Sequence, residues 1–215
     1  MREKRQQLRA EAFHRRESIS PSELGPRNER IQDRAVRFLA YLASRSVALY
    51  SPIGNEVATE RIRDHALQTG KKLFYPKLGS EDRVRLVEVK SSEEMTLGRY
   101  GILEPIGSRT LADQEREGLV VFVPGVVFDL NGNRLGRGRG WYDRLLRLLG
   151  EDGKSVALAY EFQVVEELPT EKWDRRVQHI ITEERTIDCD ALRHGPGGSP
   201  KSKIGRGCFH WNFLS

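Results

Sequence analysis

The side chains best suited to chemistry in this chain lie in residues 132–143, which read Gly-Asn-Arg-Leu-Gly-Arg-Gly-Arg-Gly-Trp-Tyr-Asp. Alternating glycines leave room for backbone N–H groups to converge on an anion. The interleaved arginines supply forked donors that match phosphate. An apolar run at 119–123 precedes this segment and a helical pattern at 141–149 overlaps its end, so the loop should open onto a helix N-terminus. The segment predicts a phosphate-binding loop.

The spacing matches no standard nucleotide motif, because the glycines run G-x-G-x-G and no Gly-Lys-Ser/Thr follows. An alternative interpretation is a solvated Arg/Gly loop in an RNA-binding protein. The aromatic residues Trp141 and Tyr142 follow at once, where a low-complexity tract would continue its bias, and this favours the phosphate loop.

The net charge of +5 arises at the two ends of the chain. Residues 1–16 carry +4 and residues 191–215 carry a further +4, which leaves −3 for the body between them. A basic face for nucleic acid is therefore not expected, and nucleic acid is an unlikely partner. Local cationic pockets could still bind small anions, because the electrostatic field in a cleft depends on the charges that line it and not on the net charge of the chain.

Composition predicts one domain and a cytoplasmic protein. The 215 residues with 38% hydrophobic content suffice for one substantial core. Two cysteines fit a reducing compartment, and no apolar run approaches the roughly 18 residues of a membrane span. We expect a domain over residues 1–192 and a disordered tail over 193–215, where Gly, Pro, Ser and Lys dominate.

The elements that must position the loop alternate between helix and strand. A polar helix is expected over 3–17, and a second begins at Ser20-Pro21, is interrupted at Gly25-Pro26 and continues to 43 with Leu39 and Leu42 on its apolar face. Beyond it we expect strands at 47–50, 73–75, 84–89, 119–123 and 156–160, and helices at 59–69 and 141–149. This rhythm predicts a single three-layer α/β domain, with a mostly parallel open sheet flanked by helices. Ligands should bind in the loops after Tyr50, Tyr75 and Val123.

Several motifs in one order resemble the 5-formyltetrahydrofolate cyclo-ligase family. The longest is Pro-Gly-Val-Val-Phe-Asp at 124–129 leading into 132–143. The other matching motifs are Leu8-Arg9, Tyr50-Ser51-Pro52 with Glu56 and Thr59, Tyr75-Pro76-Lys77, residues 101–105, and Leu168-Pro169 with Asp174 and residues 180–183.

The resemblance implies an ATP-dependent closure of 5-formyltetrahydrofolate to 5,10-methenyltetrahydrofolate, through phosphorylation of the formyl oxygen and release of ADP and phosphate. Rival interpretations are a divergent ATP-binding homologue acting on another formylated or amide substrate, and the RNA-binding protein. The resemblance also implies that ATP and the folate are the small-molecule partners and that Mg²⁺ is the cofactor. In this family's pattern Arg137 and Arg139 would stabilise the transferred phosphoryl group.

The resemblance also assigns binding residues. The ATP-binding positions correspond to Arg5, Gln6, Gln7, Leu8, Arg9, Arg134, Leu135, Gly136, Arg137, Gly138, Arg139, Gly140, Trp141 and Tyr142. The folate-binding positions correspond to Ser51, Glu56, Arg137, Gly138, Arg139, Gly140 and Trp141. A carboxylate at position 56 would accept hydrogen bonds from the donor-rich pterin edge. Its alternative role is an N-terminal charge for the helix at 59–69.

The positions of the family's magnesium ligands correspond to Asp143 and Asp174. Mg²⁺ prefers few carboxylates together with phosphate and water oxygens. The alternatives are a first-turn helix acid for Asp143 and, for Asp174, a local pair with Arg175 or Arg176.

Two positions depart from the family pattern. Arg5 stands at the usual lysine of Lys-x-x-Leu-Arg, with Lys4 one residue earlier, and Trp141 replaces Tyr or Phe. The sequence leaves open whether Lys4 or Arg5 contacts phosphate.

Overall fold

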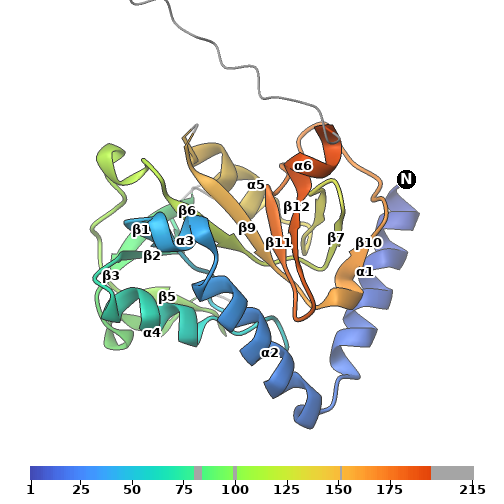
Figure 1. The fold of residues 1–215 in the computed structure, drawn as a ribbon, viewed down its shortest axis with the longest axis horizontal. Coiled ribbons are helices and arrows are strands. Elements are labelled where there is room, and N and C mark those ends of the chain that lie inside the picture. Colours follow the sequence, from blue (N-terminus) through green and yellow to red (C-terminus); the bar gives the residue numbers. More distant parts are fainter. Residues whose placement is uncertain (80–83, 99–100, 151, 195–215) are drawn as a thin grey trace, which may run out of the picture.

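The computed structural model describes residues 1–79, 84–98, 101–150 and 152–194. Its centre is a seven-stranded sheet with strand order β12-β11-β9-β6-β1-β2-β3 (Figure 1). The five inner strands pair in parallel, and the edge strands β12 and β3 run antiparallel to their neighbours. This confirms the α/β class with a mostly parallel sheet.

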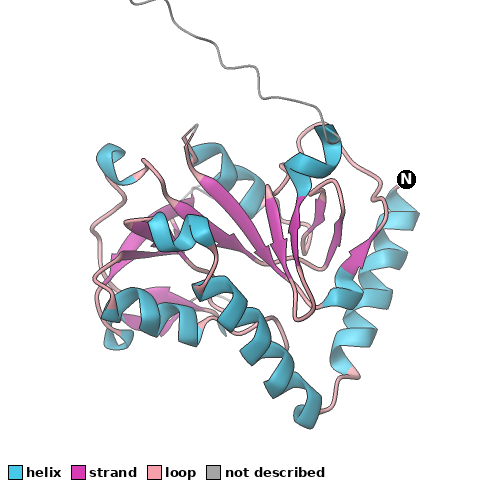
Figure 2. Cartoon of the chain, viewed as in Figure 1, coloured by secondary structure: helices cyan, strands magenta, loops and turns pink. Residues whose placement is uncertain are grey.

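Figure 2 distinguishes the helices and strands. The strands of the large sheet are β1 (Ser46–Ala48), β2 (Lys72–Leu78), β3 (Val84–Val89), β6 (Val120–Val123), β9 (Lys154–Leu158), β11 (His179–Ile181) and β12 (Thr186–Asp188). Two small sheets contain β4 (Met95–Leu97) with β5 (Leu103–Pro105), and β10 (Val164–Val165) with β7 (Val127–Asp129) and β8 (Arg134–Leu135). The helices are α1 (Arg2–Glu17), α2 (Pro21–Val36), α3 (Leu39–Ala43), α4 (Glu60–Gln68), α5 (Trp141–Leu145) and α6 (Cys189–His194).

Alternate side chains of the inner strands enter two separate cores. Val120 and Phe122 of β6 face the core under α2 and α4, whereas Val121 and Val123 face the core under α5. This alternation, with helices on both faces in Figure 1, gives the expected three layers. A third, smaller cluster joins α1 to the β7–β8 hairpin, which the sequence analysis did not anticipate.

The predicted break at Gly25-Pro26 is wrong, because α2 runs unbroken from Pro21 to Val36. Pro26 lies in the second turn and removes a single intrahelical donor. Side-chain contacts hold the helix directly after it: Arg27 pairs with Glu183 at 2.8 Å, and Asn28 accepts the backbone N–H of Ala58 at 2.9 Å.

The predicted extension of this helix to 43 is also wrong. The chain turns at Phe38, whose ring packs edge-on against His179 with centroids 4.9 Å apart, and a separate helix α3 follows. Tyr41 is the buried residue of α3, whereas Leu39 and Leu42 are 80% and 51% exposed. Because of this turn, the buried face of the helix carries Tyr41, and not Leu39 and Leu42 as the spacing had predicted.

The helix expected at 141–149 is shorter than predicted. α5 ends at Leu145 and a 3-10 turn, η5 (Leu146–Leu148), completes the segment. Its packing agrees with the prediction, because Tyr142, Leu145, Leu146 and Leu149 all contact the core under α5. Among the described residues no helix is long and apolar enough to cross a membrane. The predicted tail lies outside the described residues except for its first two positions, which end α6.

Candidate active site

A cavity of about 410 Å³ opens beyond the carboxyl ends of β1 and β6. These neighbouring strands lie where the chain direction across the sheet reverses, since β2 follows on one side of β1 and β9 on the other side of β6. Loops that diverge from such a point form the usual ligand crevice of an open α/β sheet. Ser51 and Glu56 line the cavity from the loop after β1, Pro76 from β2 and Pro124 from the loop after β6. The segments after Tyr50, Tyr75 and Val123 thus all reach this cavity, but the prediction of a loop after Tyr75 is wrong, because β2 continues to Leu78.

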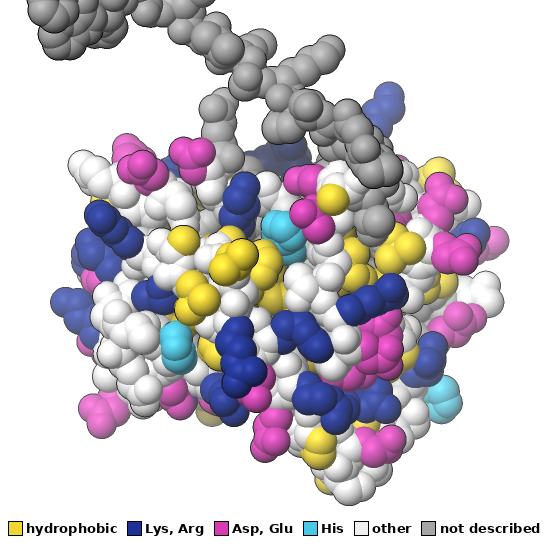
Figure 3. All heavy atoms as spheres, in the orientation of Figure 1, with side chains coloured by type: hydrophobic (Ala, Val, Ile, Leu, Met, Phe, Trp, Pro, Cys, Tyr) yellow, Lys and Arg dark blue, Asp and Glu magenta, His cyan; other side chains and the backbone are white. Residues whose placement is uncertain are grey.

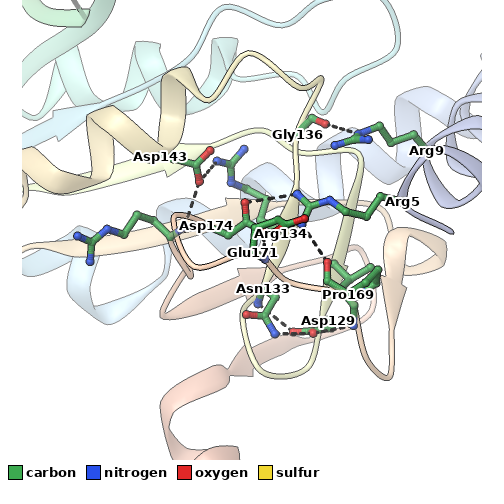
Figure 4. Close-up of polar contacts among 12 residues, drawn as sticks. Arg5, Arg9, Asp129, Asn133, Arg134, Gly136, Asp143, Pro169, Glu171 and Asp174 are labelled. Atoms are coloured by element: carbon green, nitrogen blue, oxygen red, sulfur yellow. Dashed lines mark hydrogen bonds and ion pairs between the residues drawn. The ribbon is translucent and has the colours of Figure 1, made fainter. Parts of the chain in front are cut away.

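The β7–β8 hairpin carries the Gly/Arg loop, defined here as residues 136–140, to the cavity. Its turn is locked by the fully buried Asp129, whose carboxylate accepts the backbone N–H groups of Asn131, Asn133 and Leu168 at 2.9 Å each, and the Asn133 amide at 2.7 Å (Figure 4). Gly132 has φ +79°, and a Cβ there would lie 2.1 Å from the Val177 carbonyl oxygen. The hairpin is therefore rigid before any ligand binds.

Helix α1 contributes two arginines one turn apart. The Arg9 Nε donates to the Gly136 carbonyl at 2.8 Å and so ties α1 to the Gly/Arg loop. Arg5 donates to the Pro169 carbonyl at 3.0 Å and to the Asp174 carboxylate at 2.6 Å (Figure 4). Arg5, and not the exposed Lys4, lines the cavity.

Not every predicted ATP-binding residue reaches the cavity. Gln6, Gln7 and Leu8 do not line it, and Leu8 packs into the small cluster under α1 instead. Leu135 is also buried in that cluster. The remaining predicted residues, Arg5, Arg9, Arg134 and those at 136–142, all line it.

Arg134 and Asp143 form a second ion pair in the cavity wall, with 3.1 Å between the Arg134 Nη2 and the Asp143 Oδ1. Burial lowers the pKa of the Arg134 guanidinium, and the Asp143 carboxylate opposes that shift. The Arg134 Nε is buried without a hydrogen-bond acceptor in the described part of the chain. Asp143 also accepts the backbone N–H of Arg175 at 3.1 Å, so it does more than act as a first-turn helix acid.

Asp174 is paired with Arg5 from α1, at a distance of 169 positions in sequence. The predicted local alternative, a pair with Arg175 or Arg176, is therefore wrong. The loop that follows β10 bends Asp174 inward, where its Oδ2 also accepts the backbone N–H of Glu171 at 2.9 Å.

Glu56 lies between two arginines. Its Oε1 is 3.1 Å from Arg137 Nε and 3.9 Å from Arg16 Nη1, and its Oε2 accepts the Ile53 N–H at 3.1 Å. Backbone N–H groups at the start of α4 donate instead to side chains of α2. The Ala58 N–H donates to Asn28, and the Arg61 N–H donates to Gln32 at 3.0 Å. The alternative role of Glu56, as an N-terminal charge for that helix, has no contact to support it. Ser51, the other predicted folate residue, donates to the Leu103 carbonyl at 2.7 Å.

Aromatic rings complete the cavity wall. Arg139 lies over the Trp141 ring at 5.5 Å and Arg134 over the Tyr142 ring at 5.7 Å. Burial raises the pKa of the Tyr142 hydroxyl, so it is a neutral hydrogen-bonding group at any physiological pH. Trp173 also lines the cavity and is 61% exposed. The site thus joins flat apolar surfaces to cationic forks, which suits a ligand with both rings and phosphates.

The sequence model of the 5-formyltetrahydrofolate cyclo-ligase family matches residues 1–183. The chain belongs to this family. A 5-formyltetrahydrofolate cyclo-ligase of Haemophilus influenzae is 30% identical over 177 residues, which cover 80% of this chain and 94% of that protein. The protein of that name from Mus musculus is 28% identical and covers 82% and 92%.

The solved structures agree with the family assignment. The solution structure of the Aquifex aeolicus 5,10-methenyltetrahydrofolate synthetase has 32% identity and a TM-score of 0.77, and covers 94% of this chain and 99% of that one. A synthetase of the same description from Mycoplasma pneumoniae has 25% identity and a TM-score of 0.67. The α/β architecture of this cyclo-ligase family member is therefore shared with two structures described as 5,10-methenyltetrahydrofolate synthetases.

The carboxylates of this cyclo-ligase cavity suit a magnesium ion that arrives with phosphate. Asp143 and Asp174 offer the hard oxygens that Mg²⁺ prefers, and both line the same cavity. Among the described residues no group of three or more His, Cys, Asp or Glu side chains could hold a metal. Two aspartates would therefore need phosphate and water oxygens to complete an octahedral shell.

Sequence reasoning gave no role at the site to Trp173, which lines the cavity, or to Arg16 and Asp129, which hold residues around it. The Asp-Leu-Asn-Gly-Asn turn at 129–133 carried a recognisable signal for Asp129, because aspartate bonds to backbone N–H groups two positions later. Arg16 and Trp173 gave no such signal, since their roles depend on which distant segment packs against them.

Proposed function

We propose that this chain catalyses the ATP-dependent conversion of 5-formyltetrahydrofolate to 5,10-methenyltetrahydrofolate, with release of ADP and phosphate. Membership of the cyclo-ligase family supports the reaction. The observation that carries the proposal at the level of the site is a single cavity lined by both predicted sets, Ser51 and Glu56 for the folate and the Gly/Arg loop with Arg5 and Arg9 for ATP. Direct transfer between two substrates needs such a shared site, because reacting atoms must approach to roughly 3–3.5 Å.

The proposed chemistry has two steps. The formyl oxygen first attacks the terminal phosphorus of ATP, and the bond between that phosphorus and ADP breaks. The side-arm nitrogen of the folate then attacks the formyl carbon and loses its proton. The bond between that carbon and its oxygen breaks, and phosphate leaves with the electron pair. Phosphorylation is needed because a formyl oxygen is a poor leaving group.

The residues of this chain suit positioning and charge stabilisation, which phosphoryl transfer mainly requires. Arg137 and Arg139 are the proposed catalytic residues, as their forks can follow charge on the transferred phosphoryl group. Gly138 and Gly140 have φ values of +98° and +65°, a geometry that presents backbone N–H groups to an anion. Asp143 and Asp174 would hold Mg²⁺, which neutralises phosphate charge when it is bound.

The ion pairs suggest how the charges rearrange. Arg5 and Arg134 now neutralise Asp174 and Asp143. If magnesium and triphosphate were bound together, each arginine could turn to phosphate and each aspartate could hold the cation. Each of these four charged side chains would then keep a partner of opposite sign, which avoids leaving a buried charge unpaired.

The RNA-binding alternative receives little support. Arg134 is buried, and the exposed Arg137 and Arg139 contact Glu56 and Trp141, so these arginines belong to a folded site and not to a low-complexity tract. On the face shown in Figure 3, Lys and Arg side chains are interspersed with Asp and Glu and form no continuous basic stripe.

The deciding experiment is an absorbance assay for methenyltetrahydrofolate, with and without ATP. We expect product only when ATP, Mg²⁺ and 5-formyltetrahydrofolate are all present. Binding of ATP without turnover of this substrate would favour the divergent homologue, and other formylated amides would then be screened.

A further inference from the structure

The buried Arg16 has no role in the chemistry derived so far. It lies near the end of α1, with its side chain 6% exposed and its guanidinium 3.9 Å from the Glu56 carboxylate. The Phe13 ring packs against this guanidinium at 5.2 Å, and the same ring contacts the Arg137 guanidinium at 5.3 Å. Burial lowers the pKa of Arg16, and the charge of Glu56 opposes that shift.

The two arginines around Glu56 differ in freedom. Arg137 belongs to the Gly/Arg loop, lies between two glycines and keeps 42% of its side chain exposed. Arg16 is held by its helix, by the Phe13 ring and by Asn55, whose amide donates to the Arg16 carbonyl at 3.3 Å. Arg137 can therefore leave Glu56, whereas Arg16 stays.

A consequence follows when phosphate occupies the cavity. Arg137 is the cation that a phosphoryl group would attract, and its departure removes the closest cationic partner of a carboxylate that is only 6% exposed. A buried carboxylate left without any cation is costly and has lost the side chain that fixed its position. Glu56 could then turn away from the place where it would accept hydrogen bonds from the pterin edge.

We propose that Arg16 is a positioning residue, the resident counter-ion that keeps Glu56 paired and aligned for the folate once Arg137 has turned to phosphate. The inference rests on the proposed function. It assigns different tasks to the two cations: Arg137 moves between carboxylate and phosphate, and Arg16 remains with the carboxylate. Arg16 acts on folate affinity through Glu56 and does not touch either substrate.

The test measures binding by calorimetry, with 5-formyltetrahydrofolate titrated in the presence of magnesium and a non-hydrolysable ATP analogue. We expect Arg16→Met to weaken folate binding by about 10- to 100-fold and to change the affinity for the analogue by less than about twofold. Arg16→Lys should recover part of the loss because it restores a charge. The matched control is Arg15→Met, one position away, whose guanidinium lies over Phe162 at 4.8 Å. It should bind both ligands normally.

A double-mutant cycle with Glu56→Gln separates this role from a structural one. If Arg16 acts through Glu56, Arg16→Met adds no further loss of folate affinity to Glu56→Gln. Additive losses, equal losses for both ligands, or an unchanged folate affinity in a variant that melts normally would each overturn the proposal. Should Arg16→Met not fold, Arg16→Lys and its cycle with Glu56→Gln decide in the same way. Failure of the proposed function is a separate result, because wild-type protein would then form no methenyl product.

Discussion

At the scale of single residues, the cavity is organised by pairs of opposite charge between distant segments. Arg5 with Asp174, Arg134 with Asp143, and Arg137 with Glu56 each join a cation proposed for phosphate to a carboxylate proposed for another ligand. Without substrates these groups satisfy one another. With substrates, Arg5 and Arg134 can exchange carboxylate for phosphate, and Asp174 and Asp143 can exchange arginine for Mg²⁺, whereas Glu56 keeps only Arg16, among the described residues, as a cationic partner.

The first prediction concerns Glu56→Gln. Loss of the charge should weaken folate binding by about 1.5–3 kcal/mol, the range for hydrogen bonds to charged groups, and should leave ATP binding nearly unchanged. Separate titrations with the folate and with the ATP analogue provide the measurement. Equal losses for the two ligands would assign Glu56 to structure instead.

The second prediction concerns the two aspartates. Asp143→Asn and Asp174→Asn should each raise the magnesium concentration required for turnover, because asparagine keeps an oxygen ligand but removes the charge that attracts the cation. Excess Mg²⁺ should restore part of the activity. The measurement is activity against magnesium at fixed ATP, with a thermal melt of each variant. If the curve of activity against magnesium overlays that of the wild type and only the melting temperature falls, the aspartate forms its ion pair with arginine and does not bind the metal.

At the scale of elements, the β7–β8 hairpin and its loop separate stability from function. Gly132 meets the Val177 carbonyl with no space for a Cβ, whereas around Gly138 no atom lies within 4 Å of a Cβ position. Both have positive φ. Gly132 is therefore needed because the Val177 carbonyl leaves no room for a side chain. Gly138 leaves its backbone uncovered beside the cavity.

This difference gives a third prediction. Gly132→Ala should destabilise the protein by at least about 2 kcal/mol, since it combines a clash with an unfavourable φ. Gly138→Val should retain the fold, with a cost of about 1–2 kcal/mol for its φ, yet lose turnover. Melting curves and the absorbance assay on both variants provide the comparison. Near-normal turnover of folded Gly138→Val would exclude a close approach of phosphate to this backbone.

The inner strands and most helices could be predicted because their signals are local. Continuous apolar runs predicted β6 and β9, and a capping pattern predicted the start of α2 at Pro21. The end of α2 could not be predicted, because Phe38 turns to reach His179 in a strand more than a hundred positions away. The partner of Asp174 was missed for the same reason, since nothing local to position 174 indicates Arg5.

At the scale of the whole molecule, the connection from β5 to β6 is held by a charge cluster far from the cavity. Glu115 accepts from Lys72 at 2.6 Å, from Arg109 and from the Ala112 N–H at 2.8 Å. Chiefly through the Arg109 hydrogen bond, these contacts lower the pKa of Glu115 to about 2.

The fourth prediction is a pH dependence of stability. A carboxylate with a lowered pKa stabilises the fold fully above its unfolded pKa near 4.5, and this contribution is lost as pH falls toward 2. Glu115→Gln should therefore destabilise the protein at pH 7 by about 1–2 kcal/mol, a value reduced by the half-exposed Lys72 and Arg109. Urea unfolding of both proteins between pH 7 and pH 2.5 should show the difference shrinking below pH 4.5. A difference that stays constant across this range would contradict the assignment.

The fifth prediction concerns the domain boundary. We propose that residues 1–192 are sufficient for the reaction, because the family match ends at 183 and the cavity uses no described residue beyond 174. A chain ending at Leu192 should keep the melting temperature of the full chain. Its turnover should stay within about twofold, which corresponds to a change in activation free energy below about 0.5 kcal/mol. Loss of folate turnover in a truncated chain that melts normally would assign the remaining residues to the site.

The pairing of Arg5 with Asp174 also has a consequence for biosynthesis. The two residues stand 169 positions apart, and the ion pair joins the first helix to a loop near the end of the fold. A ribosome releases the N-terminal helix first, yet the partner of that helix emerges only after almost every strand of the sheet. The proposed nucleotide end of the cavity therefore lacks this ion pair on a nascent chain that has not reached residue 174. We expect an incomplete product of translation to contain the inner strands β1, β2, β6 and β9, but to lack the complete phosphate site proposed for ATP.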